Sequence, residues 1–370
     1  MKELAILGIR GVPAAHGGFE TFAEKLSLYL VEKGWAVTVY CQIDGEGEVS
    51  ADTWRGVQRI NIPVARPGAA GTVIFDWKAT RHAARHHKLT LTLGYNTALF
   101  CTWLRIRGVR NLINMDGIEW RRDKWSAAER AWLYLNERAG CLLGNHLIAD
   151  HPQIEKHLQT RVSGRKISMI PYGADEITSA DASLLAPLGV SPDGFALVIA
   201  RPEPENSILE IVRAFSGKAR GRQLVVLGNF DTENNPYHAQ VQQVASEEVV
   251  FPGAIYEKPV LAALRYYTRL YIHGHTVGGT NPSLVEALGA GSPVLAHDNP
   301  YNRWVAGEGA AFFCDEDECA AALDALMGGT DDLGGMRQAS RNRFDRAFRW
   351  QDILQAYENC ISSVASTGKR

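Results

Sequence analysis

Residues 271–294 read YIHGHTVGGTNPSLVEALGAGSPV, and the order of apolar, glycine-rich and helical segments in them indicates the fold class. A short apolar run ends at His273 and is typical of a buried strand, and a glycine-rich loop follows over residues 274–281. Leu284–Ala290 predicts the start of a helix, and a Gly-Ser-Pro turn then leads into another strand. Strand, loop, helix and strand in this order form one unit of a parallel sheet with crossover helices.

The same alternation extends outward from this unit in both directions. The expected strands are Leu4–Gly8, Ala36–Tyr40, Leu89–Leu93, Asn111–Met115 and His146–Ala149, then Phe195–Ala200, Gln223–Leu227, Glu248–Phe251, Leu270–His273 and Pro293–Ala296. Helices are expected over Thr21–Glu32, Ser207–Phe215 and Trp350–Val364. The chain has 370 residues and so exceeds the ~250–300 residues at which a single core usually divides. We therefore expect an α/β protein of two Rossmann-like, doubly wound domains facing across a cleft, with ligands at the carboxyl ends of the strands.

The composition excludes several other classes of protein. The chain is 46% hydrophobic and 22% charged, which is ordinary for a globular protein and unlike a disordered or fibrous one. No run approaches ~20 apolar residues, so a transmembrane helix is not expected. The N-terminal apolar run turns into glycines and is interpreted as a first strand, not as a signal peptide. The six cysteines are scattered without zinc-site spacing, which fits reduced thiols in the cytosol.

The charge is unevenly distributed along the chain. Residues 1–175 contain 23 Lys or Arg and 17 Asp or Glu, whereas the remainder contains 16 and 24. The basic half could face anionic lipid or a diphosphate-linked acceptor, or it could be chance variation of the surface. The cluster Arg81, His82, Arg85, His86, His87 and Lys88 is interpreted as a solvated basic face that could touch lipid. These observations predict a cytoplasmic protein with peripheral contact to the inner face of the plasma membrane as one option.

The glycine-rich loop and the helix after it carry the clearest chemical signal. Backbone amides at a helix N-terminus bind phosphate groups well. The expected donor contacts from this loop are His275, Gly278, Gly279, Thr280 and Asn281. Glu286 lies about one turn into the helix, where its carboxylate could reach a ribose hydroxyl. Arg201 follows the first strand of the second half and could bind a diphosphate with its two-pronged guanidinium, although a surface arginine in a Glu-rich loop is the alternative.

Two loops of the first half also follow expected strands. Gly17 and Gly18 lie beside a helix start and are expected to contact the donor. Asp116 follows the strand Asn111–Met115 and could accept hydrogen bonds from sugar hydroxyls. The expected acceptor contacts are His16, Glu119 and Trp120. Glu119 could instead pair with a neighbouring arginine, and Trp120 could be packed between domains.

Together these segments resemble the retaining GT-B glycosyltransferases of family 4. The matching positions are Gly17, Gly18, Arg201, the junction residues Pro171, Gly173 and Asp175, then Glu286, residues 291–294 and the closing segment Phe348-Arg349-Trp350. Two positions depart from the family pattern, because Gly278 stands where the family has a first glutamate and Asn206 where it has a lysine. These departures, with the segments GGFET and DGIEW, resemble the bacterial rhamnosyltransferase-like subgroup that builds surface polysaccharides.

The resemblance implies a reaction and an organisation of the chain. It implies transfer of a sugar from a dTDP or UDP donor, with dTDP-L-rhamnose as a candidate, to a glycan or lipid-linked acceptor. Anomeric configuration would be retained, and no metal, other cofactor or nucleic acid would be required. From the positions of the motifs, Asp116, Arg201 and Glu286 are the residues expected in catalytic roles. It implies an acceptor domain over residues 1–172, a nucleotide-sugar domain over 173–345 and a C-terminal helix over 346–370 that crosses back to the first domain.

Two other functions remain open from the sequence, and a third is disfavoured. A GT-B sugar-nucleotide epimerase would bind the same donor and release no nucleoside diphosphate. A non-catalytic nucleotide-sugar-binding protein would bind the donor without turnover. An NAD-dependent oxidoreductase is disfavoured, because the first loop is not a GxGxxG fingerprint and no matching acid follows about 20 residues later.

Overall fold

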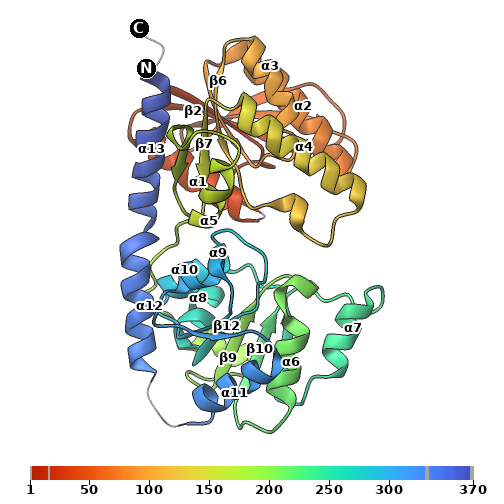
Figure 1. Cartoon of the computed structure of the whole chain (residues 1–370), viewed down its shortest axis with the longest axis vertical. Helices are drawn as coiled ribbons and strands as arrows, with labels where there is room; N and C mark the ends of the chain where they lie inside the picture. The colour runs from red at the N-terminus through yellow and green to blue at the C-terminus, as the bar shows by residue number, and fades with distance from the viewer. Residues whose placement is uncertain (1, 16, 330–332, 367–370) are drawn as a thin grey trace. The chain divides into compact units, whose positions relative to one another are not determined.

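The chain divides into two compact units in its computed structural model (Figure 1). The structure describes residues 2–15, 17–329 and 333–366. Unit 1 comprises Met1–Pro171 and Trp350–Arg370, and unit 2 comprises Tyr172–Arg349. Each unit is built on a largely parallel sheet with helices, which confirms the α/β prediction.

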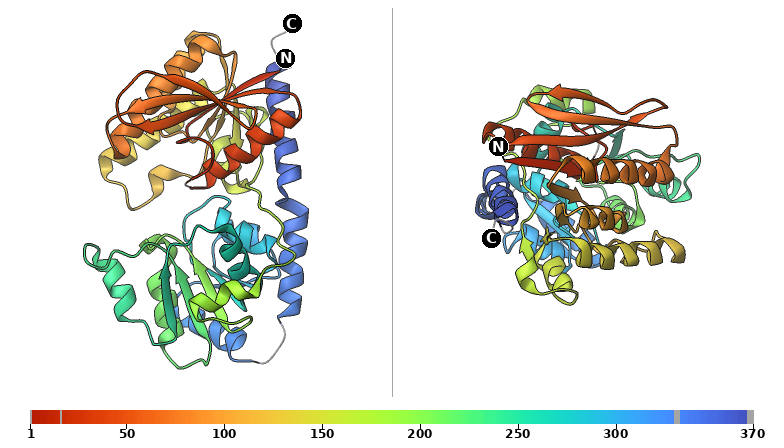
Figure 2. Two further views of the ribbon diagram at one scale, coloured as in Figure 1. Left: turned by 180° about the vertical axis from the view of Figure 1, so that it is seen from behind. Right: turned by 90° about the horizontal axis from the view of Figure 1, so that it is seen from above.

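Unit 1 contains, within the described residues, an eight-stranded sheet in the order β3-β4-β2-β1-β5-β6-β7-β8 (Figure 2). Its strands are β1 (Glu3–Leu7), β2 (Ala36–Asp44), β3 (Ser50–Trp54), β4 (Val57–Val64), β5 (Leu89–Leu93), β6 (Arg110–Asn114), β7 (His146–Ala149) and β8 (Ile167–Met169). Neighbouring strands are parallel except β3 and β4, which form an antiparallel hairpin that the sequence analysis did not predict. The exposed, polar strand β3 closes one edge of the sheet and protects it from pairing with another chain.

The helices of unit 1 form two groups. Their bounds are α1 (Gly17–Glu32), α2 (Gly68–His86), α3 (Cys101–Ile106), α4 (Ala127–Leu143), α5 (Pro152–Gln159) and α13 (Trp350–Ser366), with short 3₁₀ turns η1 (Ala98–Phe100), η2 (Glu119–Arg121) and η3 (Gly164–Lys166). Helix α1 packs against α13, whereas α2, α3 and α4 contact one another in a row (Figure 1). A capping box starts α4, because Ser126 Oγ accepts from Glu129 N and a Glu129 oxygen accepts from Ser126 N at 2.9 Å.

Unit 2 contains, in the described part of the chain, a six-stranded parallel sheet in the order β11-β10-β9-β12-β13-β14. Its strands are β9 (Phe195–Ile199), β10 (Gln223–Leu227), β11 (Val249–Gly253), β12 (Leu270–His273), β13 (Val294–His297) and β14 (Ala311–Phe313). Its helices are η4 (Ala182–Leu188), η5 (Pro204–Asn206), α6 (Ile208–Ser216), α7 (Pro236–Gln243), α8 (Lys258–Tyr267), α9 (Pro282–Gly289), α10 (Pro300–Ala306), α11 (Glu316–Met327) and α12 (Gly334–Ala347).

The central strand β9 shows why the apolar runs of unit 2 are uninterrupted. Phe195 and Leu197 belong to the core on one face of the sheet, and Ala196 and Val198 belong to the core on the other. Successive side chains of a strand point to opposite faces, and both faces of a parallel sheet are covered by helices. An alternating polar pattern would therefore leave polar groups in one of the two cores.

The C-terminal helix α13 completes unit 1 by packing on its first helix and on β6. The rings of Phe22 and Tyr357 lie 4.5 Å apart between centroids, and Ile361 is buried one turn further along. The Nδ2 group of Asn114, at the end of β6, donates to the buried hydroxyl of Tyr357 at 2.8 Å. The predicted helix over Trp350–Val364 is thus confirmed. Among the helices in the described residues, none is long and apolar enough to cross a lipid bilayer.

The substitution Tyr357→Phe tests this anchor. It should lower the free energy of unfolding by about 1–2 kcal/mol, because the amide of Asn114 would stay buried without its acceptor. Urea denaturation followed by tryptophan fluorescence measures the change. Tyr256→Phe is the matched control, since that ring is 76% exposed and its hydroxyl should contribute within about 0.5 kcal/mol. Equal effects of the two substitutions would contradict the anchoring role.

Candidate functional site

The glycine-rich loop of unit 2 connects β12 to α9 at the carboxyl edge of the sheet. At Gly274 a Cβ atom would lie 2.2 Å from the carbonyl oxygen of Asn206, so only glycine fits. Gly279 has a φ of 149°, which a residue with a side chain rarely adopts. Asn281 caps α9, because its side-chain oxygen accepts from Ser283 N at 3.1 Å.

Asn206 holds this loop against the loop that follows β9. Its Nδ2 group donates to the carbonyl oxygen of Arg201 at 2.7 Å, and its Oδ1 therefore faces Nδ1 of His275, with which it forms a short hydrogen bond. Nδ1 of His275 carries the proton of that bond, because an amide oxygen only accepts. The Thr276 amide donates to Glu205 O at 2.8 Å and adds a second connection between the two loops. The sequence analysis noted Asn206 only as a departure from the family pattern.

Helix α10 supports the same loop from its other side. Asn299 and Asn302 both donate from Nδ2 to the carbonyl oxygen of His275, at 3.0 and 2.8 Å. The ring of Tyr301 lies against Gly278 so closely that a Cβ atom there would be 2.1 Å from the ring. Position 278, where the sequence resemblance places a glutamate, is therefore covered by an aromatic ring. No local signal in the sequence indicates this contact.

The loop leaves positively polarised groups available at its tip. Among the described residues, no group accepts a hydrogen bond from the amides of Gly278 and Gly279. The side chain of Arg201 is exposed, and within the same described set its guanidinium has no ion-pair or hydrogen-bond partner. Free amides before a helix N-terminus, and an unpaired arginine in the same unit, are groups that bind an anion.

Glu286 lies in α9 and forms an ion pair that the sequence analysis did not predict. One of its oxygens accepts from Nη2 of Arg265, on α8, and the two side chains are 33% and 8% exposed respectively. A buried guanidinium that loses its carboxylate would be an uncompensated charge, so this pair fixes the position of Glu286. The two residues come from separate helices, and only the folded structure shows that they meet.

A buried histidine lies below the loop. His273 ends β12 and is 4% exposed. Burial, followed by the neighbouring His275 and His297, lowers the pKa of His273 well below its ordinary value. It is therefore neutral at physiological pH and supplies no charge to an anion above it.

The first loop of unit 1 differs from that of unit 2, because carboxylates of its own helix occupy two of its amides. Glu20 accepts from Arg10 N at 3.3 Å and Glu24 accepts from Ala14 N at 2.7 Å. Gly17 starts α1 with a φ of 71°, and Gly18 follows it in the first turn. The predicted acceptor contact His16 lies outside the described residues.

Asp116 stands at the carboxyl end of β6 in an unusual backbone conformation. Its φ is 50°, and its amide donates to Asn114 Oδ1 at 2.9 Å. Because Asn114 also bonds to Tyr357, the C-terminal helix supports this residue. Burial, followed by the charges of Glu119 and Asp150, raises the pKa of Asp116 to about 7. Its carboxyl group is thus partly protonated near neutrality and can donate as well as accept a hydrogen bond.

The two other candidates beside Asp116 use their polar groups within unit 1. Glu119 accepts from Nη1 of Arg122 at 2.8 Å, which is one of the alternatives that the sequence left open. The indole nitrogen of Trp120 donates to buried Glu137 at 2.6 Å. Their roles as acceptor contacts remain predictions. No group of three or more His, Cys, Asp or Glu side chains in the described part of the chain is arranged to hold a metal ion.

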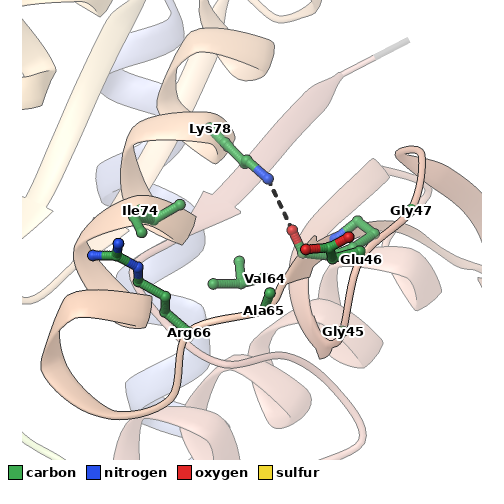
Figure 3. Close-up of a pocket in the computed structure, with 9 residues that line it drawn as sticks. Gly45, Glu46, Gly47, Val64, Ala65, Arg66, Ile74 and Lys78 are labelled. Atoms are coloured by element: carbon green, nitrogen blue, oxygen red, sulfur yellow. Dashed lines mark hydrogen bonds between the residues drawn. The ribbon is translucent and has the colours of Figure 1, made fainter.

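A pocket of about 300 Å³ opens in unit 1 beside the carboxyl ends of β2 and β4 (Figure 3). The side chains of Arg66 and Lys78 line it together with those of Glu46 and Ile74. Lys78 is held by a hydrogen bond from Nζ to the carbonyl oxygen of Pro63 at 2.9 Å. The sequence analysis did not identify this pocket, because its lining comes from a hairpin and a helix that it did not predict.

The packing of Tyr301 on Gly278 gives a test by double-mutant cycle. Gly278→Ala should lower the free energy of unfolding by about 1–3 kcal/mol, because the added methyl group overlaps the ring. In a protein that already carries Tyr301→Ala, the same substitution should lower the free energy of unfolding by clearly less. Gly335→Ala is the control, since nothing lies within 4 Å of its Cβ position. A Gly278→Ala cost that does not depend on Tyr301 would contradict the contact.

The raised pKa of Asp116 predicts a pH dependence of stability. A carboxyl group that keeps its proton in the folded state, and releases it when unfolded, makes folding less favourable as pH rises from about 4 to about 7. Asp116→Asn removes this term and suits the left-handed backbone, so the variant should gain stability relative to the wild type between pH 5 and pH 8. Denaturation of the wild type and the variant at pH 5 and at pH 8 measures the difference in their free energies of unfolding. Asp123→Asn, which removes an exposed carboxylate, is the control. If the difference in stability between Asp116→Asn and the wild type is the same at pH 5 and pH 8, the pKa of Asp116 is not raised.

Comparison with known proteins extends the description of the fold. Residues 1–175 match a family model described as a domain of unknown function, DUF1972. A search of curated protein sequences finds no match. Among solved structures, a sucrose-phosphate synthase from Thermosynechococcus elongatus is similar at a TM-score of 0.79 and 18% identity, over 98% of this chain and 100% of that one.

Two further solved structures have the same arrangement of elements. Anabaena Alr3699/HepE, in complex with UDP and glucose, matches at a TM-score of 0.75 and 16% identity, over 98% of this chain and 100% of its own. An α,α-trehalose-phosphate synthase (UDP-forming) from Burkholderia xenovorans, in complex with glucose-6-phosphate, matches at 0.71 and 12% identity, with the same coverage. These similarities confirm the predicted GT-B fold for this chain.

Proposed function

We propose that this protein is a glycosyltransferase that uses a nucleotide-diphosphate sugar and binds its donor mainly through unit 2. The observation that carries the proposal is the loop before α9, in which the amides of Gly278 and Gly279 have no acceptor in the described structure. The carboxyl edge of a parallel sheet is where ligands bind in doubly wound folds. The structural relatives crystallised with UDP, or named as UDP-forming enzymes, give independent support.

The chemistry of the donor explains why these groups suit it. Breaking the bond between the sugar and the diphosphate leaves additional negative charge on the phosphate oxygens. Fixed amide dipoles and the exposed guanidinium of Arg201 stabilise that charge more in the transition state than in the ground state. Asn206 keeps the two loops in register, so these donors need little reorganisation during the reaction.

Glu286 is assigned to the ribose of the donor. Its ion pair with Arg265 holds one oxygen, and the side chain remains one-third exposed for a hydroxyl group. In the proposed reaction the sugar retains its anomeric configuration, and the departing phosphate accepts the proton of the attacking hydroxyl. Asp116 of unit 1 is assigned to orient a sugar hydroxyl, for which its raised pKa allows both donation and acceptance.

The donor is further proposed to be dTDP-L-rhamnose and the product a bacterial surface polysaccharide, on the basis of the sequence resemblance to the rhamnosyltransferase-like subgroup of family 4. A 6-deoxy sugar offers fewer hydroxyl groups to the protein than glucose does. The ring of Tyr301 on Gly278 supplies an apolar surface at the position of the missing glutamate, which supports such a donor. UDP sugars are the competing donors in the same proposal.

Nucleotide binding gives the direct test. Saturating dTDP, UDP, GDP and ADP are each added to the protein, and a ligand that binds the folded state raises its melting temperature. Arg201→Ala should weaken binding of the preferred nucleoside diphosphate about tenfold, whereas the control Arg213→Ala in α6 should leave it unchanged. Stabilisation by none of the four nucleotides, or equal binding by both variants, would contradict the proposed site.

Product analysis separates transfer from the two competing functions. A glycosyltransferase releases a nucleoside diphosphate when an acceptor is present. An epimerase converts the donor into a new sugar nucleotide and releases none, and a sensor binds the donor and leaves it unchanged. Phosphorus NMR of the reaction mixture distinguishes these three outcomes, and either of the last two would contradict the transferase proposal.

A further inference from the structure

The helices α2, α3 and α4 of unit 1 expose an unusual concentration of large apolar side chains. Among the described residues, most of the exposed large apolar side chains of the whole chain lie on these helices and on the turn η1. They are Val73, Trp77, Leu99, Ile106, Trp132, Tyr134, Leu135 and Leu142. The most exposed are Leu142 at 76%, Ile106 at 68% and Leu135 at 56%. We call this set the α2–α4 surface.

The residues of the α2–α4 surface belong to elements that contact one another. Trp77 of α2 lies 5.2 Å from Phe100 of η1 and 6.3 Å from Trp103 of α3, between ring centroids. Helix α4 is bound to η1, because the amide of Leu99 donates to Asn136 Oδ1 at 2.9 Å. On α4, the spacing of Trp132, Leu135 and Leu142 places them on one helical face. The elements that carry these apolar side chains therefore lie side by side in unit 1 (Figure 1).

The same region is strongly basic. Between Gly68 and Arg110 the sequence has seven Lys or Arg residues and one acidic residue, Asp76. Asp76 is turned inward, where it accepts a hydrogen bond from Thr97 Oγ1 at 2.8 Å. Two of the arginines stand over tryptophan rings of this region, Arg81 over exposed Trp77 and Arg107 over half-buried Trp103. Exposed basic side chains, Arg81, Arg85 and Arg105 among them, thus lie on the same helices as the exposed apolar ones.

We propose that the α2–α4 surface binds the surface of an anionic lipid bilayer. Exposed apolar and tryptophan side chains insert at the boundary between headgroups and acyl chains, and surrounding Lys and Arg side chains attract anionic headgroups. The proposal needs no enzymatic activity and does not depend on the proposed function. It extends the predicted basic face at residues 81–88, of which His82 forms a hydrogen bond with Tyr40.

The charge distribution favours lipid over a second copy of the chain. In a symmetric dimer the same patch of both subunits would be juxtaposed, so the cations of one α2–α4 surface would face those of the other. Like charges brought together in this way repel each other, and among the described residues of α2, α3 and α4 the one exposed acidic side chain is Glu129, which accepts a hydrogen bond from Ser126 N at the start of α4. An anionic bilayer satisfies both the apolar and the basic groups.

Vesicle flotation with the full-length protein tests the proposal. Wild-type protein should float with vesicles in which about one-third of the lipid is phosphatidylglycerol, should not float with pure phosphatidylcholine, and should be released by about 1 M salt. The triple variant Ile106→Gln, Leu135→Gln, Leu142→Gln should reduce the bound fraction at least tenfold. These side chains are exposed, so the melting temperature should be unchanged, which excludes misfolding as the cause.

Further variants separate the apolar and the basic contributions to vesicle binding, each with its own control. Tyr256→Gln removes an equally exposed apolar side chain in unit 2 and should bind vesicles as the wild type does. Arg81→Gln with Arg105→Gln should weaken binding to anionic vesicles, whereas Lys33→Gln, on α1, should not. Absence of flotation, equal flotation on neutral vesicles, or an α2–α4 dimer in sedimentation that the triple variant abolishes would each overturn the proposal.

Discussion

The two hydrogen bonds of the Asn206 side chain organise the candidate site of unit 2. One amide group binds the backbone of the loop after β9, through Arg201 O, and the loop after β12, through His275. These loops follow adjacent parallel strands, so their separation is set by the sheet and their register by this amide. The amides of Gly278 and Gly279, the exposed Arg201 and the start of α9 depend on that register for their positions.

Close packing then determines which residues this loop can contain. Gly274 lies against the backbone of Asn206, and Gly278 lies against the ring of Tyr301. A larger residue at either position would displace the loop from its supports. At position 278 the close approach of Tyr301 from α10 therefore leaves room for glycine alone.

Unit 1 uses a second connected set of hydrogen bonds to support Asp116. Its amide is bound by Asn114, and Asn114 in turn donates to Tyr357 of the C-terminal helix. A segment near the C-terminal end of the sequence thus stabilises a loop in its first third. The same burial that fixes Asp116 also raises its pKa, so packing and proton affinity at this residue have one cause.

Much of the fold could be predicted from the sequence, because buried parallel strands are short apolar runs. Leu89–Leu93, His146–Ala149 and Leu270–His273 have the predicted bounds. The hairpin β3–β4 was not predicted, since its edge strand is polar and β4 mixes polar with apolar residues.

The partners of the site residues could not be predicted, because each contact joins distant parts of the chain. Arg265 reaches Glu286 from another helix, and Tyr301 reaches Gly278 from α10. The exposure of the apolar side chains of α4 could not be predicted from the sequence either. A helix with a stripe of apolar residues ordinarily turns that stripe to the core, and only the structure shows which face is exposed.

A crystal structure of the protein with its preferred nucleoside diphosphate would test the central claim most directly. The account predicts difference density for the two phosphates within hydrogen-bond distance of the Gly278 and Gly279 amides, with the guanidinium of Arg201 turned toward them and the ribose beside Glu286. Phosphates bound elsewhere in the chain, with the loop at residues 274–281 empty, would contradict it.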